Sequence, residues 1–186
     1  MRPLILASCS DEYHDLYANP FRNSAEQHGM EVRIVRGGNM NPGAAAALRY
    51  LKLPHVLKEY PSVLVLDIDS IINEPIDFND KWDIGLFLRT GYDDIRKKVL
   101  GSAFYIHQRA IDFAWLLRKR LKDDARWYED QVALYKTHQA TLGKYKVKLL
   151  GTDFINWHCT PASIWTGKGE AKTTNEKFLA QLKRYS

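Results

Sequence analysis

The chain has few cysteines and no long apolar segment, and both shortages exclude classes of protein. Its 186 residues include only two cysteines, Cys9 and Cys159, which are too few for a disulfide framework or a zinc cluster. The apolar run Leu4–Ala7 is much shorter than a signal peptide requires, and no segment approaches the roughly 18 apolar residues that span a bilayer. We therefore expect a soluble, cytoplasmic protein with no transmembrane segment.

Glycine and proline are also scarce, at 11 and 7 residues, and the sequence contains no repeat or low-complexity stretch. With 45% hydrophobic and 26% charged residues, the composition is that of a globular protein. The length favours a single domain over residues 1–186, with a looser C-terminal tail from about residue 151. The net charge of +5 favours an anionic ligand without specifying which one.

Short apolar runs alternate with longer segments of helical period, which is typical of an α/β sandwich built from strand-helix-strand units. Ser10 is expected to cap the first helix through its hydroxyl, and Pro54 to kink or interrupt the second near Leu53. The predicted strands are Leu4–Ala7, Val32–Val35, Val63–Leu66, Ile84–Leu88, Ala103–Ile106 and Val147–Leu150, and the predicted helices are Asp11–His28, Ala44–Leu57, Ile111–Leu121, Glu129–Leu142 and about Asn175–Arg184.

The strongest chemical signal is the pair Asp67 and Asp69, directly after the buried run Val63–Leu66. On an extended segment, residues two apart point the same way, so both carboxylates can converge on one hard cation. Ligands of α/β sheets gather beyond the carboxyl ends of strands, and Mg²⁺ or Mn²⁺ held there keeps positions free for diphosphate oxygens. The alternative interpretation is a pair of acids in a solvated turn, satisfied by backbone amides.

The run Arg49–Leu57 followed by Val63–Ile71 resembles the glycogenin-like and galactosyltransferase-like, family 8 type, nucleotide-diphospho-sugar transferases. Their sequence reads approximately Tyr-Arg-Leu-x-x-Pro-x-x-Leu, followed by an apolar strand and Asp-x-Asp. The resemblance implies a single-domain GT-A (Rossmann-like) three-layer α/β sandwich with a mostly parallel central sheet. It also implies that Asp67 and Asp69 hold the metal and that Arg49 contacts the donor nucleotide. Without the family, Arg49 reads equally well as a surface residue paired with an acid.

The resemblance extends to both sides of this core. It implies donor-binding roles for Ala7, Ser8, Asp11, Tyr13, Ile68, Gly101 and Ser102, with Tyr13 stacking on uracil. An equally open interpretation packs Tyr13 into the core together with Tyr17 and Phe21. Gly101 and Ser102 would face the donor sugar, although the asparagine of the family's Asn-x-Gly turn is missing here. Asp130 and Gln131 resemble the family's catalytic Asp-Gln element, which contacts the transferred sugar and the acceptor; a first-turn acid interacting with the helix dipole is the alternative.

The C-terminal part matches the family's His-x-x-Gly-x-x-Lys less well. Gly169 and Lys172 fit as diphosphate contacts, and Lys168 suits the same role, but Thr166 stands where the family has a metal-binding histidine. Either water or His158 would then complete the metal shell, or metal binding is weakened.

Together these features predict a metal-dependent hexosyltransferase, retaining by resemblance, that uses Mn²⁺ or Mg²⁺ and a UDP-sugar. The acceptor is an unknown glycan, protein or small molecule, and no nucleic-acid partner is expected. Four alternatives stay open. They are a haloacid-dehalogenase-like phosphatase with Asp67 as nucleophile, a degenerate nucleotide-sugar-binding protein, a basic nucleic-acid module with Arg126-Trp127-Tyr128, and a Cys9–His14 nucleophilic pair.

Overall fold

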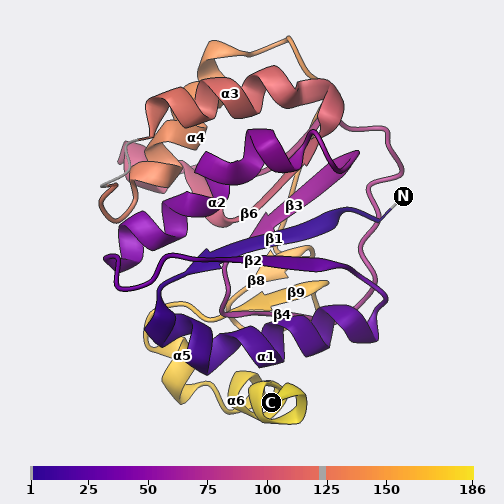
Figure 1. Cartoon of the computed structure of the whole chain (residues 1–186), viewed down its shortest axis with the longest axis vertical. Helices are drawn as coiled ribbons and strands as arrows, with labels where there is room; N and C mark the ends of the chain where they lie inside the picture. The colour runs from indigo at the N-terminus through magenta and orange to yellow at the C-terminus, as the bar shows by residue number, and fades with distance from the viewer. Residues whose placement is uncertain (1, 122–124) are drawn as a thin grey trace.

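A six-stranded sheet forms the centre of the computed structural model, which describes residues 2–121 and 125–186 (Figure 1). Its strand order is β2-β1-β3-β6-β5-β7. The strands are β1 (Leu4–Cys9), β2 (Val32–Arg36), β3 (Ser62–Leu66), β5 (Ile84–Leu88), β6 (Val99–His107) and β7 (Val147–Leu149). Neighbouring strands run parallel except where β6 pairs antiparallel with β3 and β5. The predicted α/β fold with a mostly parallel central sheet is therefore confirmed.

Helices cover both faces of this sheet, as a three-layer sandwich requires (Figure 1). One face carries α2 (Pro42–Val56), α3 (Ile111–Arg120) and α4 (Glu129–Ala140). The opposite face carries α1 (Asp11–Gln27), which packs against α6 (Glu176–Tyr185).

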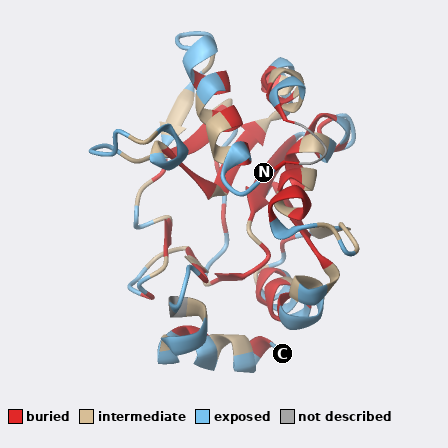
Figure 2. Cartoon of the chain, turned by 90° about the vertical axis from the view of Figure 1, so that its left-hand side faces the viewer, coloured by how far each residue is buried: buried red, intermediate tan, exposed pale blue. Residues whose placement is uncertain are grey.

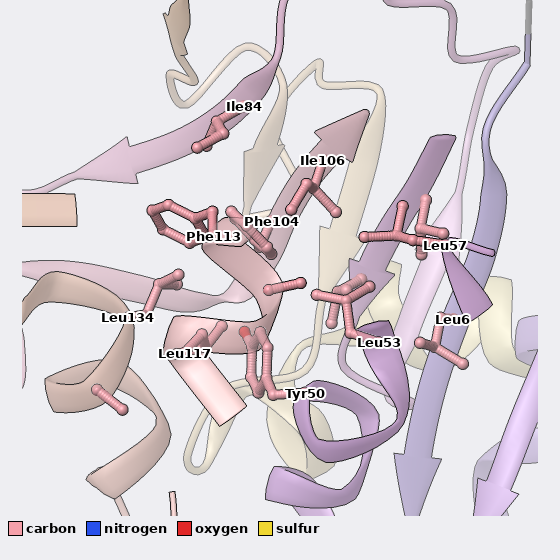
Figure 3. Packing of buried hydrophobic residues seen from close by; sticks show 14 of the residues in the cluster. Leu6, Tyr50, Leu53, Leu57, Ile84, Phe104, Ile106, Phe113, Leu117 and Leu134 are labelled. Carbon is pink, nitrogen blue, oxygen red and sulfur yellow. The ribbon is translucent and has the colours of Figure 1, made fainter. Parts of the chain in front are cut away.

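Two large apolar clusters lie one on each face of the sheet, and a smaller one around Ile71 and Phe178 joins a small second sheet to α6. In the first cluster, Tyr50 and Leu53 of α2 lie near Phe104 of β6 and Phe113 of α3 (Figure 3). All residues of β1 and β3 are buried, which explains why their sequences read as continuous apolar runs and not as alternating ones (Figure 2). These two buried strands end at the candidate site and fix the positions of the residues that follow them.

The helix ends differ from the predicted ones by at most two residues, and the start of α2 differs in a way that matters for the site. The helix α2 begins at Pro42, where Asn41 Oδ1 accepts a hydrogen bond of 2.9 Å from the backbone nitrogen of Ala44. It continues through Pro54 to Val56, so the predicted interruption near Leu53 is wrong. A proline so close to the end of a helix removes only one backbone hydrogen bond. Ser10 occupies the N-cap position of α1 as predicted, but the expected hydrogen bond from its hydroxyl is wrong, because the side chain makes no capping bond.

A second, three-stranded sheet in the order β4-β9-β8 was not predicted, because its strands have only two or three residues each. They are β4 (Ser70–Ile72), β8 (Ile155–Asn156) and β9 (Ile164–Thr166), and they are followed by the short helix α5 (Ala171–Thr174). The described part also contains two short 3₁₀ segments, η1 (Ile95–Lys97) and η2 (Gln108–Ala110). Among the described residues, no helix combines the length and apolar character needed to cross a membrane.

Candidate functional site

A cavity of about 490 Å³ opens where β1 and β3 end. The strands β2 and β3 flank β1 on opposite sides, so the chain reverses its strand order here, which is where open α/β sheets bind ligands. The start of the antiparallel strand β6 reaches the same edge, because Ala103 pairs with Leu66. The tail returns to this edge as well, since the backbone nitrogen of Gly167 donates to the carbonyl of Asp69 at 2.7 Å.

Arg49 is the buried cation of the site, with only 2% of its side chain exposed. Its Nη1 lies 2.5 Å from Asp67 Oδ1, and its Nη2 lies 3.5 Å from Asp130 Oδ2. The guanidinium also donates to the carbonyls of Leu66 and Gly101, each at 3.2 Å. One side chain of α2 therefore joins the exit of β3, the start of β6 and the first turn of α4.

The charges of this cluster depend on one another. Burial would raise the pKa of Asp67, but the Arg49 guanidinium lowers it below its ordinary value. Burial raises the pKa of Asp130, and the partial attraction of Arg49 does not reverse that shift. Burial alone would lower the pKa of Arg49, yet Asp67, Tyr50 and Asp130 hold it above its ordinary value. Asp67 is therefore the ionised partner of a permanently charged arginine.

Asp69 belongs to a second ion pair of the cavity. Its Oδ2 lies 3.1 Å from Lys172 Nζ, which also donates to the Tyr13 hydroxyl at 3.2 Å. Burial and the nearby charge of Asp67 raise the pKa of Asp69 to about 6. Ile68 and Asp69 form a turn, so the expectation of an extended Asp-x-Asp segment is wrong, although both carboxylates line the cavity.

The cavity can hold a divalent ion only with help from a ligand. Asp67 and Asp69 offer hard oxygen donors, and each has one oxygen already engaged by Arg49 or Lys172. Within residues 2–121 and 125–186, no group of three or more His, Cys, Asp or Glu side chains is placed to hold a metal. The two carboxylates therefore fit Mg²⁺ or Mn²⁺ if diphosphate oxygens and water complete the coordination shell.

Most of the residues predicted from sequence line this one cavity. They are Ser8, Tyr13, Arg49, Asp67, Ile68, Asp69, Gly101, Ser102, Asp130, Gln131, Lys168, Gly169 and Lys172. Ala7 and Asp11 do not line it. Ala7 is fully buried in the core beneath the site, and Asp11 pairs with Arg36 at 2.9 Å on the surface.

Thr166 and His158 are not among the residues that line the cavity either. Thr166 is 2% exposed on β9, opposite Ser70 of β4. The ring of His158 lies beside Trp157.

At Gly101, the strand β6 lies very close to the side chains of the first turn of α4. A Cβ atom at this position would lie 2.9 Å from Gln131 Cγ and 3.3 Å from Asp130 Oδ2, so any larger residue displaces both side chains. The Gly101 carbonyl accepts from the Tyr50 hydroxyl at 2.8 Å as well as from Arg49. The resemblance named Gly101 as a donor contact, and the structure adds that it positions Asp130 and Gln131.

Five residues at the mouth of the cavity were not assigned to the site from the sequence. Arg89 follows β5, Tyr92 and Lys97 follow it in a charged loop, and Trp127 and Tyr128 precede α4. The position of Arg89 could have indicated its role, because it directly follows a strand that ends at the same edge as β1 and β3. Aromatic residues in the two connecting segments added a second signal.

Cys9 lines the cavity, but its chemistry is not that of a nucleophile. Burial raises the pKa of the Cys9 thiol to about 11, so it stays protonated near neutral pH. The imidazole of His14 has a different neighbour, Asp15, at 3.6 Å. The structure therefore gives the Cys9–His14 alternative no support.

The fold is that of GT-A-like glycosyltransferases. A comparison of the sequence with known protein families finds no match, and neither does a comparison with curated proteins. Among solved structures, the chain is similar to the WbbM bifunctional glycosyltransferase in its apo form, with a TM-score of 0.68 and 10% identity. That alignment covers 97% of this chain and 49% of the other, so the chain spans about half of WbbM.

A second similar structure is a glycosyltransferase involved in glycosylation of the major capsid of PBCV-1. Its TM-score is 0.66 at 14% identity, and the alignment covers 96% of this chain and 100% of that one. At such low identity these likenesses establish the fold alone.

Proposed function

We propose that this chain transfers a hexosyl group from a nucleotide diphosphate, a UDP-sugar, to an acceptor hydroxyl. The observation that carries the proposal is the placement of Asp67 and Asp69 at the carboxyl end of β3, facing a cavity that also holds Arg49, Lys168 and Lys172. Two carboxylates for a cation and several cations for phosphate, at the switch point of a glycosyltransferase fold, suit a diphosphate-linked donor.

The proposed reaction breaks the bond between the sugar's anomeric carbon and the diphosphate oxygen. A new bond forms between that carbon and the acceptor oxygen, whose proton passes to the oxygen of the departing diphosphate. Lys172 and Lys168 stabilise the charge that develops on the departing diphosphate, because preorganised cations in a poorly hydrated site favour the transition state. Asp130 and Gln131 orient the transferred sugar, and Tyr13 with Ser8 borders the base.

The metal belongs to the same proposal. When bound, Mn²⁺ or Mg²⁺ would neutralise charge on the diphosphate. Asp67 and Asp69 would hold it, with Arg49 fixing the Asp67 carboxylate through the 2.5 Å contact. The sequence resemblance supports retention of anomeric configuration, and the two unpaired cysteines suit a cytoplasmic location.

The phosphatase alternative is not favoured. A nucleophilic aspartate has to be free to attack phosphorus, whereas Asp67 is bound to the buried guanidinium of Arg49. The described residues also provide no third acidic ligand for the magnesium site of such an enzyme. The other alternative is a protein of this fold that binds a nucleotide-sugar but does not transfer the sugar. Only an activity measurement distinguishes it from an active transferase.

The test is release of UDP from UDP-glucose or UDP-galactose in the presence of Mn²⁺. We expect slow release by the wild type, because water replaces the missing acceptor, and loss of at least 90% of the rate in Asp69→Asn. Asp112→Asn, on a side chain that is 76% exposed on α3, is the matched control and should keep the wild-type rate. UDP binding without any release would indicate a degenerate transferase, and inorganic phosphate from small phosphoesters would indicate a phosphatase.

A further inference from the structure

The mouth of the cavity carries three aromatic rings that binding of the donor does not account for. Tyr92 is 44% exposed, Trp127 is 58% exposed and Tyr128 is 40% exposed, and all three line the cavity. Trp and Tyr offer large, rigid surfaces at little cost in side-chain entropy, and their clustering on an exposed rim marks a binding surface. The hexose ring has a face of C–H groups that packs on such rings.

The Trp127–Tyr128 pair has a defined orientation. The two ring centroids lie 6.1 Å apart and the planes meet at 82°. The backbone beneath them contacts α2 closely, since a Cβ on Gly43 would lie only 2.6 Å from the Trp127 nitrogen. Tyr128 itself adopts φ 74°, a left-handed conformation that costs energy for any residue other than glycine. The fold therefore holds these rings in place.

Two cations flank the third ring. The Arg89 guanidinium carbon lies 5.5 Å from the centre of the Tyr92 ring, and Lys97 Nζ lies 6.0 Å from it. Within residues 2–121 and 125–186, neither has a carboxylate partner within 4 Å, whereas Arg49 and Lys172 are both paired. The buried Nε of Arg89 also has no hydrogen-bond partner among the described residues. Hydrogen bonding lowers the pKa of the Asp94 carboxylate, and the charge of Lys97 acts in the same direction without pairing directly with that carboxylate. Two cations without a directly paired carboxylate favour an anion.

These cations adjoin the reacting end of the cavity. Arg89 Nη2 donates to Gln131 Oε1 at 3.0 Å and to the Val99 carbonyl at 2.9 Å. Gln131 in turn contacts Gly101, next to Asp130. Burial lowers the pKa of Lys168, and the charge of Arg89 helps to lower it. A group bound by Arg89 and Lys97 would thus lie beside Gln131, at the end of the cavity where the proposed reaction places the transferred sugar.

Building on the proposed glycosyl transfer, we propose that the acceptor is an anionic saccharide. Trp127 and Tyr128 stack on its sugar ring, while Arg89 and Lys97 bind its phosphate or carboxylate group. Single-stranded nucleic acid also combines aromatic and basic contacts, but successive bases stack on platforms that lie roughly parallel. The 82° angle between the Trp127 and Tyr128 rings does not provide two such platforms.

The experiment measures binding to the full chain, with UDP and Mn²⁺ present, by saturation-transfer NMR. The probes are glucose, glucose 6-phosphate, glucuronate and a short oligothymidylate. We expect both anionic sugars to bind about tenfold more tightly than glucose at low salt, with the preference shrinking as salt screens the exposed Lys97. The phosphate and carboxylate probes together show which anion the site prefers.

Two variants separate the ring contacts from the charge contacts. Lys97→Gln should reduce the preference for anionic sugars over glucose about threefold to tenfold. Trp127→Ala should lower the affinity for all three sugars by a similar factor. The matched controls are Lys136→Gln, an exposed lysine on α4, and Leu149→Ala, which is 65% exposed on β7; both should bind like the wild type. Melting temperatures confirm that every variant is folded.

The inference fails if glucose binds as tightly as the anionic sugars, if no sugar binds at tens of millimolar, or if oligothymidylate binds best. It also fails if Lys97→Gln and Trp127→Ala behave like their controls. Calorimetric titration of UDP into the same samples distinguishes the two proposals. Loss of sugar binding with intact UDP binding overturns only the acceptor, whereas absence of UDP binding overturns the proposed transfer as well.

Discussion

Arg49 ties together more of the site than any other side chain described above. It neutralises Asp67, approaches Asp130 and binds two backbone carbonyls, all while 2% exposed. The sequence resemblance identified the position but assigned it to the nucleotide. The structure adds its protein partners, because the guanidinium lines the cavity and at the same time pairs with Asp67 and approaches Asp130. A single sequence cannot distinguish these roles, since both require a long cation on the same face of α2.

Replacing Arg49 with methionine should therefore destabilise the whole protein. The change leaves Asp67 and Asp130 without their partner at a largely buried position, and we expect a loss of about 3 kcal/mol in the free energy of unfolding. Urea denaturation measures it. Arg33→Met is the matched control, because Arg33 pairs with Glu59 on the surface at 2.9 Å and should cost less than about 1 kcal/mol. Equal losses in the two variants would contradict the role given to Arg49.

Cys9 provides a second test at the scale of a single residue. Because its pKa is raised to about 11, we expect iodoacetamide to alkylate it slowly at pH 7 and roughly tenfold faster for each added pH unit up to about that value. The rate is followed by mass spectrometry. UDP with Mn²⁺ should slow the reaction, because Cys9 lines the proposed donor cavity. Rapid labelling at pH 7 would restore the possibility of a nucleophilic thiolate.

Among the elements, the start of α2 fixes the loop that carries the aromatic rings. Gly43 lies in its first turn, where a Cβ would come within 2.6 Å of the Trp127 nitrogen and 2.7 Å of the Arg126 carbonyl carbon. This close approach explains a glycine in a run that otherwise consists of alanines. The alanine run from Ala44 predicted a helix correctly, but the first turn at Pro42 and Gly43 was expected to be a loop. Local helix propensity also cannot reveal the contact with a segment more than 80 residues away.

Gly43→Ala should accordingly destabilise the protein by about 1–3 kcal/mol, since backbone atoms have to move to admit the methyl group. A Gly→Ala change inside a helix that meets no steric clash stabilises the protein by up to about 1 kcal/mol. The sign of the change in unfolding free energy therefore shows whether a Cβ at position 43 meets the segment before α4. Thermal or urea unfolding gives the sign. A stabilised Gly43→Ala protein would mean that α2 and the segment before α4 are not in contact.

The strand β9 offers a matched pair of changes at one position. Thr166 is buried, and its Oγ1 has no hydrogen-bond partner among the described residues. Thr166→Val should therefore be neutral or stabilising by up to about 1 kcal/mol, whereas Thr166→His should overpack the strand and cost about 1–3 kcal/mol. Calorimetric titration of Mn²⁺ should show no gain for Thr166→His, because Thr166 does not line the cavity. A clear gain in Mn²⁺ affinity would show that residue 166 does reach the metal site.

On the scale of the whole molecule, the sequence predicted the large sheet well and the small one not at all. Buried strands such as β3 are long and uniformly apolar, so their pattern is unambiguous, whereas β8 has only two residues. The two acids of the site could be predicted because they follow β3 directly. The position of Arg89 after β5 hinted at a role in the site, but nothing local joins it to Trp127, because the two residues line the same cavity only through the tertiary fold.

The cavity draws on almost the full length of the chain, from Ser8 on β1 to Lys172 in the tail. We propose that these distant segments form one site for a nucleotide diphosphate and a divalent ion. Because Asp69 and Lys172 already pair at 3.1 Å and no third protein ligand is placed nearby among the described residues, neither the ion nor the nucleotide should bind tightly alone. Each should raise the affinity for the other by the same factor.

Calorimetric titration of UDP, with and without Mn²⁺, into wild type and Asp69→Asn tests this claim most directly. We predict that Mn²⁺ raises the affinity of the wild type for UDP at least tenfold, that UDP raises its affinity for Mn²⁺ equally, and that Asp69→Asn abolishes the coupling while Asp112→Asn preserves it. Absence of UDP binding, or an affinity that is the same with and without Mn²⁺ and in both variants, would contradict the account.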